Sequence, residues 1–140
     1  MDSIRNARVN IISSLLSILY HNGWFIIYKT LLAEHKSLSV MLLSVDEFSD
    51  IVDAHGRNAG DDILDKVVSY LAEHMRDQDI LGRWSSAEFI ILLPHTGPHV
   101  AFDMAQNLRH GIATLSPLQE LPEIVITASI GISYTASPRA

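Results

Sequence analysis

The chain has no cysteine among its 140 residues, so disulfide bonds and thiolate metal sites are excluded. This absence fits a reducing compartment and favours a cytoplasmic location. Basic residues are also few, since ten Lys and Arg accompany sixteen Asp and Glu, for a net charge of -6. Binding along a nucleic-acid backbone requires clustered Lys and Arg, and those of this chain are scattered. We therefore expect no nucleic-acid partner.

Long hydrophobic runs are missing as well. The apolar segments 11–19 and 24–32 are both shorter than the roughly 20 residues that a bilayer span requires. Tyr20-His21-Asn22-Gly23 separates them, and no small-residue cleavage site follows the first. We interpret them as amphipathic helices broken near Asn22 and Gly23, and we expect no membrane span.

The length and the 48% apolar content predict one domain over residues 1–140 with a real core. Hydrophobic periodicity predicts a helical lead-in over residues 1–35, followed by a β-α-α-β-β-α-β order. The predicted strands are 37–45, 80–84, 88–93 and 124–134, and the predicted helices are 46–54, 61–75 and 100–112. This order predicts a mixed α/β (α+β) fold, in which helices flank a central sheet that includes one β-hairpin.

Two residues beside the predicted helix 61–75 have an ordinary structural interpretation. Asp61 would lie in the first turn, after the helix-breaking stretch Asn58-Ala59-Gly60, where an acidic side chain suits the helix dipole. Arg76 would suit the C-terminal end of the same helix for the complementary reason.

Several spaced motifs carry a family resemblance. Residues 44–64 fit, without a gap, the pattern Asp-x-Asp-x-Phe-Lys-x-Ile-Asn-Asp-x-x-Gly-His-x-x-Gly-Asp-x-x-Leu. Further along come Arg76-Asp77-Gln78-Asp79, Arg83, Ser85-Ser86-Ala87-Glu88-Phe89, Leu93-Pro94 and Thr127-Ala128-Ser129-Ile130-Gly131-Ile132. This collinear set resembles the GGDEF family of diguanylate cyclase domains over roughly residues 14–135. The hairpin then carries a degenerate form of the family signature.

The resemblance implies a reaction in which two GTP molecules condense with the help of Mg²⁺. It places the metal-binding carboxylates at Ser44 and Ala87, neither of which can supply one. The guanine-reading Asn of the family is Val52 here, and the family's C-terminal helix with its phosphate-binding Lys is absent. We therefore predict that the chain is not an enzyme and holds no metal, and that Asp61, Glu88 and Arg83 remain from a vestigial nucleotide site.

The pair Arg76 and Asp79 matches the family's inhibitory Arg-x-x-Asp site, which binds cyclic di-GMP. An Arg fork can contact a phosphate or a guanine edge, and an Asp can accept from guanine N–H groups. The resemblance thus implies a cyclic di-GMP receptor, with Arg109 as a candidate third residue. Inheritance without use and a local surface ion pair are the competing interpretations.

Two further functions stay open. The apolar segment 11–32 favours a ligand-independent module that forms a homodimer or regulates a partner domain by contact. A residual diguanylate cyclase or GTP-binding activity is the third hypothesis.

Overall fold

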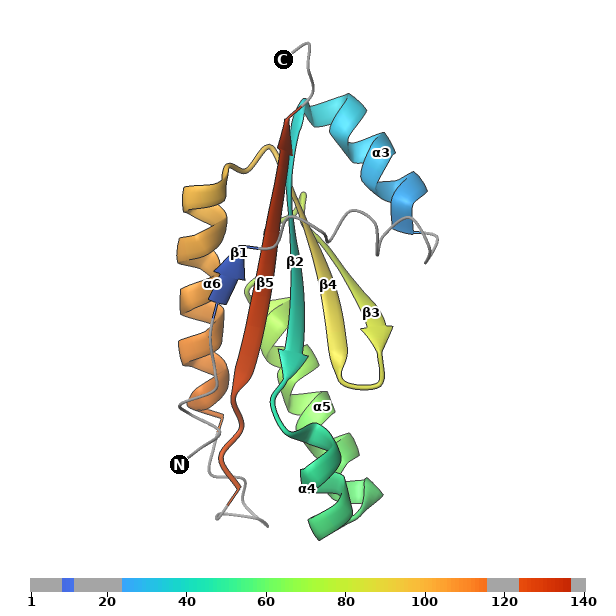
Figure 1. Ribbon diagram of the computed structural model, residues 1–140, viewed down its shortest axis with the longest axis vertical. Coiled ribbons are helices and arrows are strands. Elements are labelled where there is room, and N and C mark those ends of the chain that lie inside the picture. Colours follow the sequence, from blue (N-terminus) through green and yellow to red (C-terminus); the bar gives the residue numbers. More distant parts are fainter. Residues whose placement is uncertain (1–8, 12–23, 116–123, 137–140) are drawn as a thin grey trace.

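The computed structural model describes residues 9–11, 24–115 and 124–136, which form one sheet with helices on both faces (Figure 1). The strands are β1 (Val9–Ile11), β2 (Ser37–Val45), β3 (Ile80–Ser85), β4 (Glu88–Pro94) and β5 (Ala128–Ala136). The helices are α3 (Trp24–His35), α4 (Phe48–His55), α5 (Arg57–Glu73) and α6 (Pro98–Ala113). The strand order is β1-β5-β2-β4-β3, with β1 parallel to β5 and every other pair antiparallel.

The larger part of the core lies between the sheet and helices α5 and α6. Side chains alternate across a strand, so β2 and β4 each send every second residue to this face. The central strands contribute Met41, Leu43, Val45, Phe89, Ile91 and Leu93, and α5 and α6 contribute Ile63, Val67, Leu71, Ala101, Ala105 and Ile112. This packing anchors the C-terminal end of α5, and thereby the turn that follows it.

Helix α3 covers the opposite face of the sheet. Tyr28 packs there against the other residue set of the same strands, which comprises Leu38, Val40, Ile90 and Leu92. The outer side of α3 carries two exposed apolar side chains, Ile26 at 76% exposure and Ile27. No helix in the described ranges is long and apolar enough to cross a membrane.

Most predicted elements are confirmed, including strand 37–45 with both of its ends and the hairpin around Ser85 and Ser86. The prediction of a fully helical lead-in over residues 1–35 is wrong in part, since β1 is a strand that pairs in parallel with β5. The last part of that lead-in is helical as predicted, since it forms α3. Residues 1–8, 12–23, 116–123 and 137–140 lie outside the described ranges.

Helix α5 begins at Arg57, four residues before the predicted start, so Gly60 lies inside it. A Cβ at Gly60 would come within 2.7 Å of Val52 Cγ2, and the missing side chain therefore lets α4 and α5 pack closely. Asp61 is consequently not in the first helical turn, which contains no acidic residue. Its interpretation as a first-turn acid was wrong.

Helices α5 and α6 also meet through a glycine. Gly111 faces the Tyr70 hydroxyl so closely that any Cβ would collide with it. Burial at this contact raises the pKa of Tyr70 above its ordinary value. Helix α6 continues past Gly111 to Ala113.

Candidate functional site

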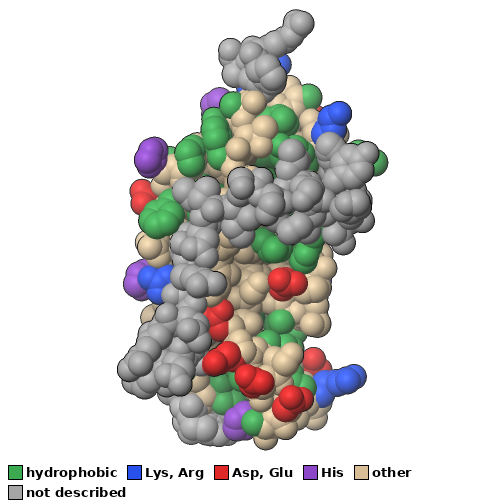
Figure 2. All heavy atoms as spheres, viewed as in Figure 1, with side chains coloured by type: hydrophobic (Ala, Val, Ile, Leu, Met, Phe, Trp, Pro, Cys, Tyr) green, Lys and Arg blue, Asp and Glu red, His purple; other side chains and the backbone are tan. Residues whose placement is uncertain are grey.

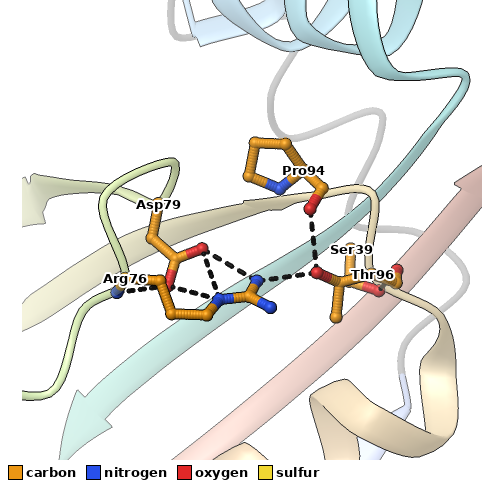
Figure 3. A network of polar contacts seen from close by, with 5 residues as sticks. All are labelled: Ser39, Arg76, Asp79, Pro94 and Thr96. Carbon is orange, nitrogen blue, oxygen red and sulfur yellow. Dashed lines mark hydrogen bonds and ion pairs between the residues drawn. The ribbon is translucent and has the colours of Figure 1, made fainter.

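The turn between α5 and β3 holds Arg76 and Asp79 in a closed arrangement (Figure 3). Asp79 Oδ1 accepts from Arg76 Nε at 3.1 Å and from Nη2 at 2.9 Å. Asp79 Oδ2 accepts from the same Nε at 3.1 Å and from the Arg76 backbone N–H at 2.8 Å. The Asp79 backbone N–H donates to the Arg76 carbonyl at 3.0 Å, which closes the turn.

Arg76 also reaches a second loop of the protein. Its Nη2 donates to Thr96 Oγ1 at 2.7 Å, and this hydroxyl donates to the Pro94 carbonyl at 2.9 Å. The Thr96 carbonyl accepts from the buried hydroxyl of Ser39 on β2 at 2.7 Å. The network thus connects the turn before β3 with the end of β4 and with the central strand (Figure 3).

The two charged partners differ in exposure. The Asp79 side chain has 0% of its surface exposed, whereas that of Arg76 keeps 35%. Because both Asp79 oxygens already accept from Arg76, the carboxylate has no surface with which to meet a ligand in this arrangement. Arg76 is therefore the part of the pair that a ligand can contact, and Asp79 holds it.

Arg109, the third residue predicted for this site, lies in the C-terminal half of α6. Its Nε donates to Gln106 Oε1 at 3.0 Å, and its Nη2 lies 3.2 Å from His110 Nε2. Within the described part of the chain, no hydrogen bond or ion pair joins Arg109 to Arg76 or Asp79. The structure therefore brings together only two of the three predicted residues.

The residues predicted for the nucleotide site lie at the other end of the β3–β4 hairpin. Ser44 pairs with Glu88 across β2 and β4, so their side chains share one face of the sheet. Glu88 accepts from Ser44 Oγ at 3.0 Å and from Ser85 Oγ at 2.5 Å. Ala87 packs against the core on the opposite face, as expected for a neighbour of Glu88.

Arg83 stabilises the tip of the hairpin. Its Nε donates to the Ser85 carbonyl at 2.7 Å and its Nη2 to the Ser86 carbonyl at 2.6 Å. Its guanidinium carbon also lies 5.2 Å from the centre of the Phe89 ring, within cation–π range. Arg83 therefore acts first as a clamp on the turn that carries the signature.

Two open cavities flank this tip. One, of about 360 Å³, is lined by residues 44, 45, 47–50 and 85–88, which include Ser44, Ala87 and Glu88. The other, of about 300 Å³, is lined by Phe48, Val52, Arg57, Asp61, Leu64, Arg83 and Ser86. They share Phe48 and Ser86 and so adjoin, with Glu88 lining the first cavity and Asp61 and Arg83 lining the second.

Acidic side chains dominate the surface near the first cavity. Glu47, Asp50 and Asp53 are exposed, and Figure 2 shows acidic side chains gathered where Figure 1 places α4. Asp46 is engaged elsewhere, since it accepts from Thr127 and Ser129 at 2.7 Å each. In the described ranges, no three His, Asp or Glu residues lie close enough together to hold a metal ion.

Comparison with known proteins places this geometry in a family. Residues 27–140 match the family described as "Diguanylate cyclase, GGDEF domain". Diguanylate cyclase A of Treponema denticola is 30% identical, over 74% of this chain and 31% of its own length. The chain thus spans about a third of that relative. Other relatives are also named diguanylate cyclases, and the chain covers an even smaller share of their length.

Solved structures agree with the predicted fold. Diguanylate cyclase SiaD of Pseudomonas aeruginosa, in complex with its activator SiaC, has a TM-score of 0.70 and 25% identity, and the match covers 82% of this chain and 47% of SiaD. The GGDEF domain of DgcB from Caulobacter crescentus, in complex with c-di-GMP, has a TM-score of 0.71 at 18% identity, over 79% and 70% of the two chains. The α/β fold and the GGDEF resemblance are both confirmed.

The prediction that the chain is not an enzyme is contradicted by these comparisons, because the family and several of its relatives, including that of Treponema denticola, are named for diguanylate cyclase activity. That prediction rested on the combined changes at positions of the family pattern, among them Ser44, Val52 and Ala87. The hairpin tip nevertheless keeps a carboxylate, Glu88, in a cavity beside Ser44. Departures from the family pattern at these positions are therefore not sufficient to conclude that the chain is inactive.

Proposed function

Because this chain belongs to the GGDEF family of diguanylate cyclase domains, we propose that it binds cyclic di-GMP through the guanidinium of Arg76. The observation that carries the proposal is that the Arg76 guanidinium is held in place while its side chain stays partly exposed. Its guanidinium is held at Nε and Nη2, yet 35% of the side chain stays exposed. A cation fixed in advance loses little conformational freedom when a ligand binds.

The ligand fits the chemistry of this group. A guanidinium offers paired N–H donors to a phosphate or to the O6 and N7 atoms of guanine, and its flat face can stack on a purine. Cyclic di-GMP presents all three features. The DgcB domain, which shares the fold, is described in complex with this dinucleotide, and that supports the choice of ligand.

Isothermal titration of the chain with cyclic di-GMP tests the proposal. The wild-type chain should bind with a micromolar dissociation constant, and Arg76→Ala should weaken binding at least tenfold because it removes the only proposed contact. Lys66→Ala is the matched control, since it removes one exposed positive charge from α5 away from the turn. Absence of heat at about 100 µM ligand, or equal binding by Arg76→Ala, would remove the proposal.

A second candidate function is binding of a guanine nucleotide at the hairpin tip, with the turnover that the relatives' names indicate. The observation that favours it is the pair of adjoining cavities, of about 360 and 300 Å³, that contain Glu88, Asp61 and Arg83. Pyrophosphate release from GTP, with Mg²⁺ or Mn²⁺ supplied, tests turnover. Release that persists in Arg76→Ala and stops in Glu88→Gln would assign the reaction to this end of the hairpin.

A further inference from the structure

Among the described residues, the hydroxyl of Thr96 is the one hydrogen-bond partner that reaches the Arg76 guanidinium from outside its own turn. It accepts from Arg76 Nη2 at 2.7 Å and donates its single hydrogen to the Pro94 carbonyl at 2.9 Å. Only 2% of Thr96 is exposed, so water does not compete for either bond. Because the hydrogen is committed to Pro94, the oxygen must present a lone pair to Arg76.

We propose that Thr96 is a positioning residue, which sets the orientation of the Arg76 guanidinium for a phosphate or guanine ligand. This inference rests on the function proposed for Arg76 and adds a residue to its site. Thr96 does not contact the ligand and acts only through Arg76.

The Thr96 hydroxyl occupies one of the N–H donors of the Arg76 guanidinium that Asp79 leaves free. A guanidinium has five N–H groups. The Nε hydrogen and one Nη2 hydrogen are directed at Asp79, and the second Nη2 hydrogen is directed at Thr96. The two hydrogens on Nη1 have no hydrogen-bond partner among the described residues, and Figure 3 shows the guanidinium nitrogen without a dashed line pointing away from Asp79. A ligand would therefore meet Nη1 first.

Asp79 alone leaves one motion open. Both of its oxygens contact the Nε and Nη2 edge, so the guanidinium can still tilt about that edge. Thr96 lies 20 positions further along the chain and holds Nη2 from another direction. Two contacts from different directions restrict the tilt, which a single bidentate pair does not.

Thr96 can serve as a fixed reference because its own loop is tied to β2. The Ser39 hydroxyl, which is fully buried, donates to the Thr96 carbonyl at 2.7 Å. The backbone N–H of His95 donates to the Ser37 carbonyl at 2.8 Å. Through Thr96 and its loop, β2 thus fixes the orientation of the Arg76 guanidinium.

Three variants separate positioning from folding, with cyclic di-GMP titration as the measurement. Thr96→Val keeps the shape but removes the hydroxyl, and it should weaken binding about tenfold, as expected for loss of a hydrogen bond to a charged group. Thr96→Ser keeps the hydroxyl and should bind within about twofold of wild type. Ser39→Ala removes one of the two ties between this loop and β2 but keeps the Thr96 hydroxyl and the bond from His95 to Ser37, so it should also bind within about twofold.

Equal binding by Thr96→Val and wild type would overturn the proposal. So would equal weakening by Thr96→Val and Ser39→Ala, since that pattern reports a loosened loop and not a misplaced guanidinium.

A ligand-free readout keeps this test separate from the function proposed for Arg76. The side-chain N–H signals of Arg76 can be followed by ¹⁵N NMR in the free protein. Thr96→Val should shift the Arg76 Nη2 signal and speed its exchange, while Thr96→Ser and Ser39→Ala leave it in place. An unchanged signal in Thr96→Val overturns the positioning role, whether or not wild type binds cyclic di-GMP. If the Arg76 Nη2 signal shifts in Thr96→Val but the wild-type chain does not bind cyclic di-GMP, the positioning role stands and only the function proposed for the site is removed.

Discussion

The two ends of the β3–β4 hairpin each carry a carboxylate that accepts several hydrogen bonds, but they use it differently. Just before β3, the Asp79 side chain is fully buried and accepts from a charged arginine. At the tip, Glu88 accepts from two serine hydroxyls at the mouth of an open cavity. The first carboxylate fixes one cation in place, and the second stays accessible to solvent and to ligands.

The two ends also differ in the charge that a ligand would meet. The Arg76 end is tied to β2 through Thr96 and Ser39, and it presents a positively charged guanidinium. The tip is held by Arg83 and is tied to β2 as well, through the hydrogen bond from Ser44 to Glu88, but its cavity is lined by the exposed acids Glu47 and Asp50. A polyphosphate approaching the tip would need a cation to offset these charges.

The largest expected effect comes from the buried carboxylate. Asp79→Asn should lower the free energy of unfolding by about 2–3 kcal/mol, because it leaves the arginine without its charged partner. The loss should stay below that of a fully buried ion pair, because 35% of the Arg76 side chain remains in solvent. Urea unfolding measures it, with the exposed neighbour Asp77→Asn as control. Equal stability of the two variants would contradict a structural role for Asp79.

The next effect concerns the cavity at the tip, where Val52 lines the wall beside Asp61. Val52→Asn places an amide where it can hydrogen-bond a guanine edge, and it should raise GTP affinity about tenfold. Val52→Ala, which has no amide, should not. If the Asn and Ala variants bind GTP equally, the cavity does not receive the base.

Arg83 should contribute a smaller amount to the free energy of unfolding. Arg83→Ala removes two hydrogen bonds to the turn carbonyls and the contact with Phe89, and it should cost about 1 kcal/mol of stability. Hydrogen exchange should rise at residues 85–87 and stay unchanged at residues 76–79. Arg57→Ala, at the start of α5, is the matched control. Faster exchange at both ends would show that the ends are not independent.

The smallest effect is expected at Glu88. Because its partners are neutral hydroxyls and the site is only partly buried, Glu88→Gln should change the free energy of unfolding by about 0.5 kcal/mol. Urea unfolding beside the exposed control Glu73→Gln measures the change. A loss as large as that of Asp79→Asn would abolish the contrast between the two carboxylates.

Local patterns predicted most of the fold. Strand 37–45 was predicted at both ends because its apolar run has the length of a buried strand. The start of α5 was missed because Gly60 resembles a helix breaker, whereas only its contact with Val52 in α4 explains it. β1 was missed because its pairing with β5 joins residues more than a hundred positions apart.

The candidate site was predicted less completely, for a similar reason. The spacing of Arg76 and Asp79 indicated a pair, but no local pattern indicates that Asp79 is buried. Thr96 was not considered, since its contact with Arg76 depends on how β4 ends and α6 begins. The contact between Ser44 and Glu88 could have been predicted from antiparallel register, had the pairing of β2 with β4 been worked out.

The most direct measurement is a titration of the ¹⁵N-labelled chain with cyclic di-GMP, followed by ¹⁵N NMR at both ends of the hairpin. Binding through Arg76 predicts shifts at residues 76–80 and 94–97, with the tip at residues 85–88 unchanged. Shifts confined to the tip, or no shifts at a ligand concentration of about 1 mM, would contradict it.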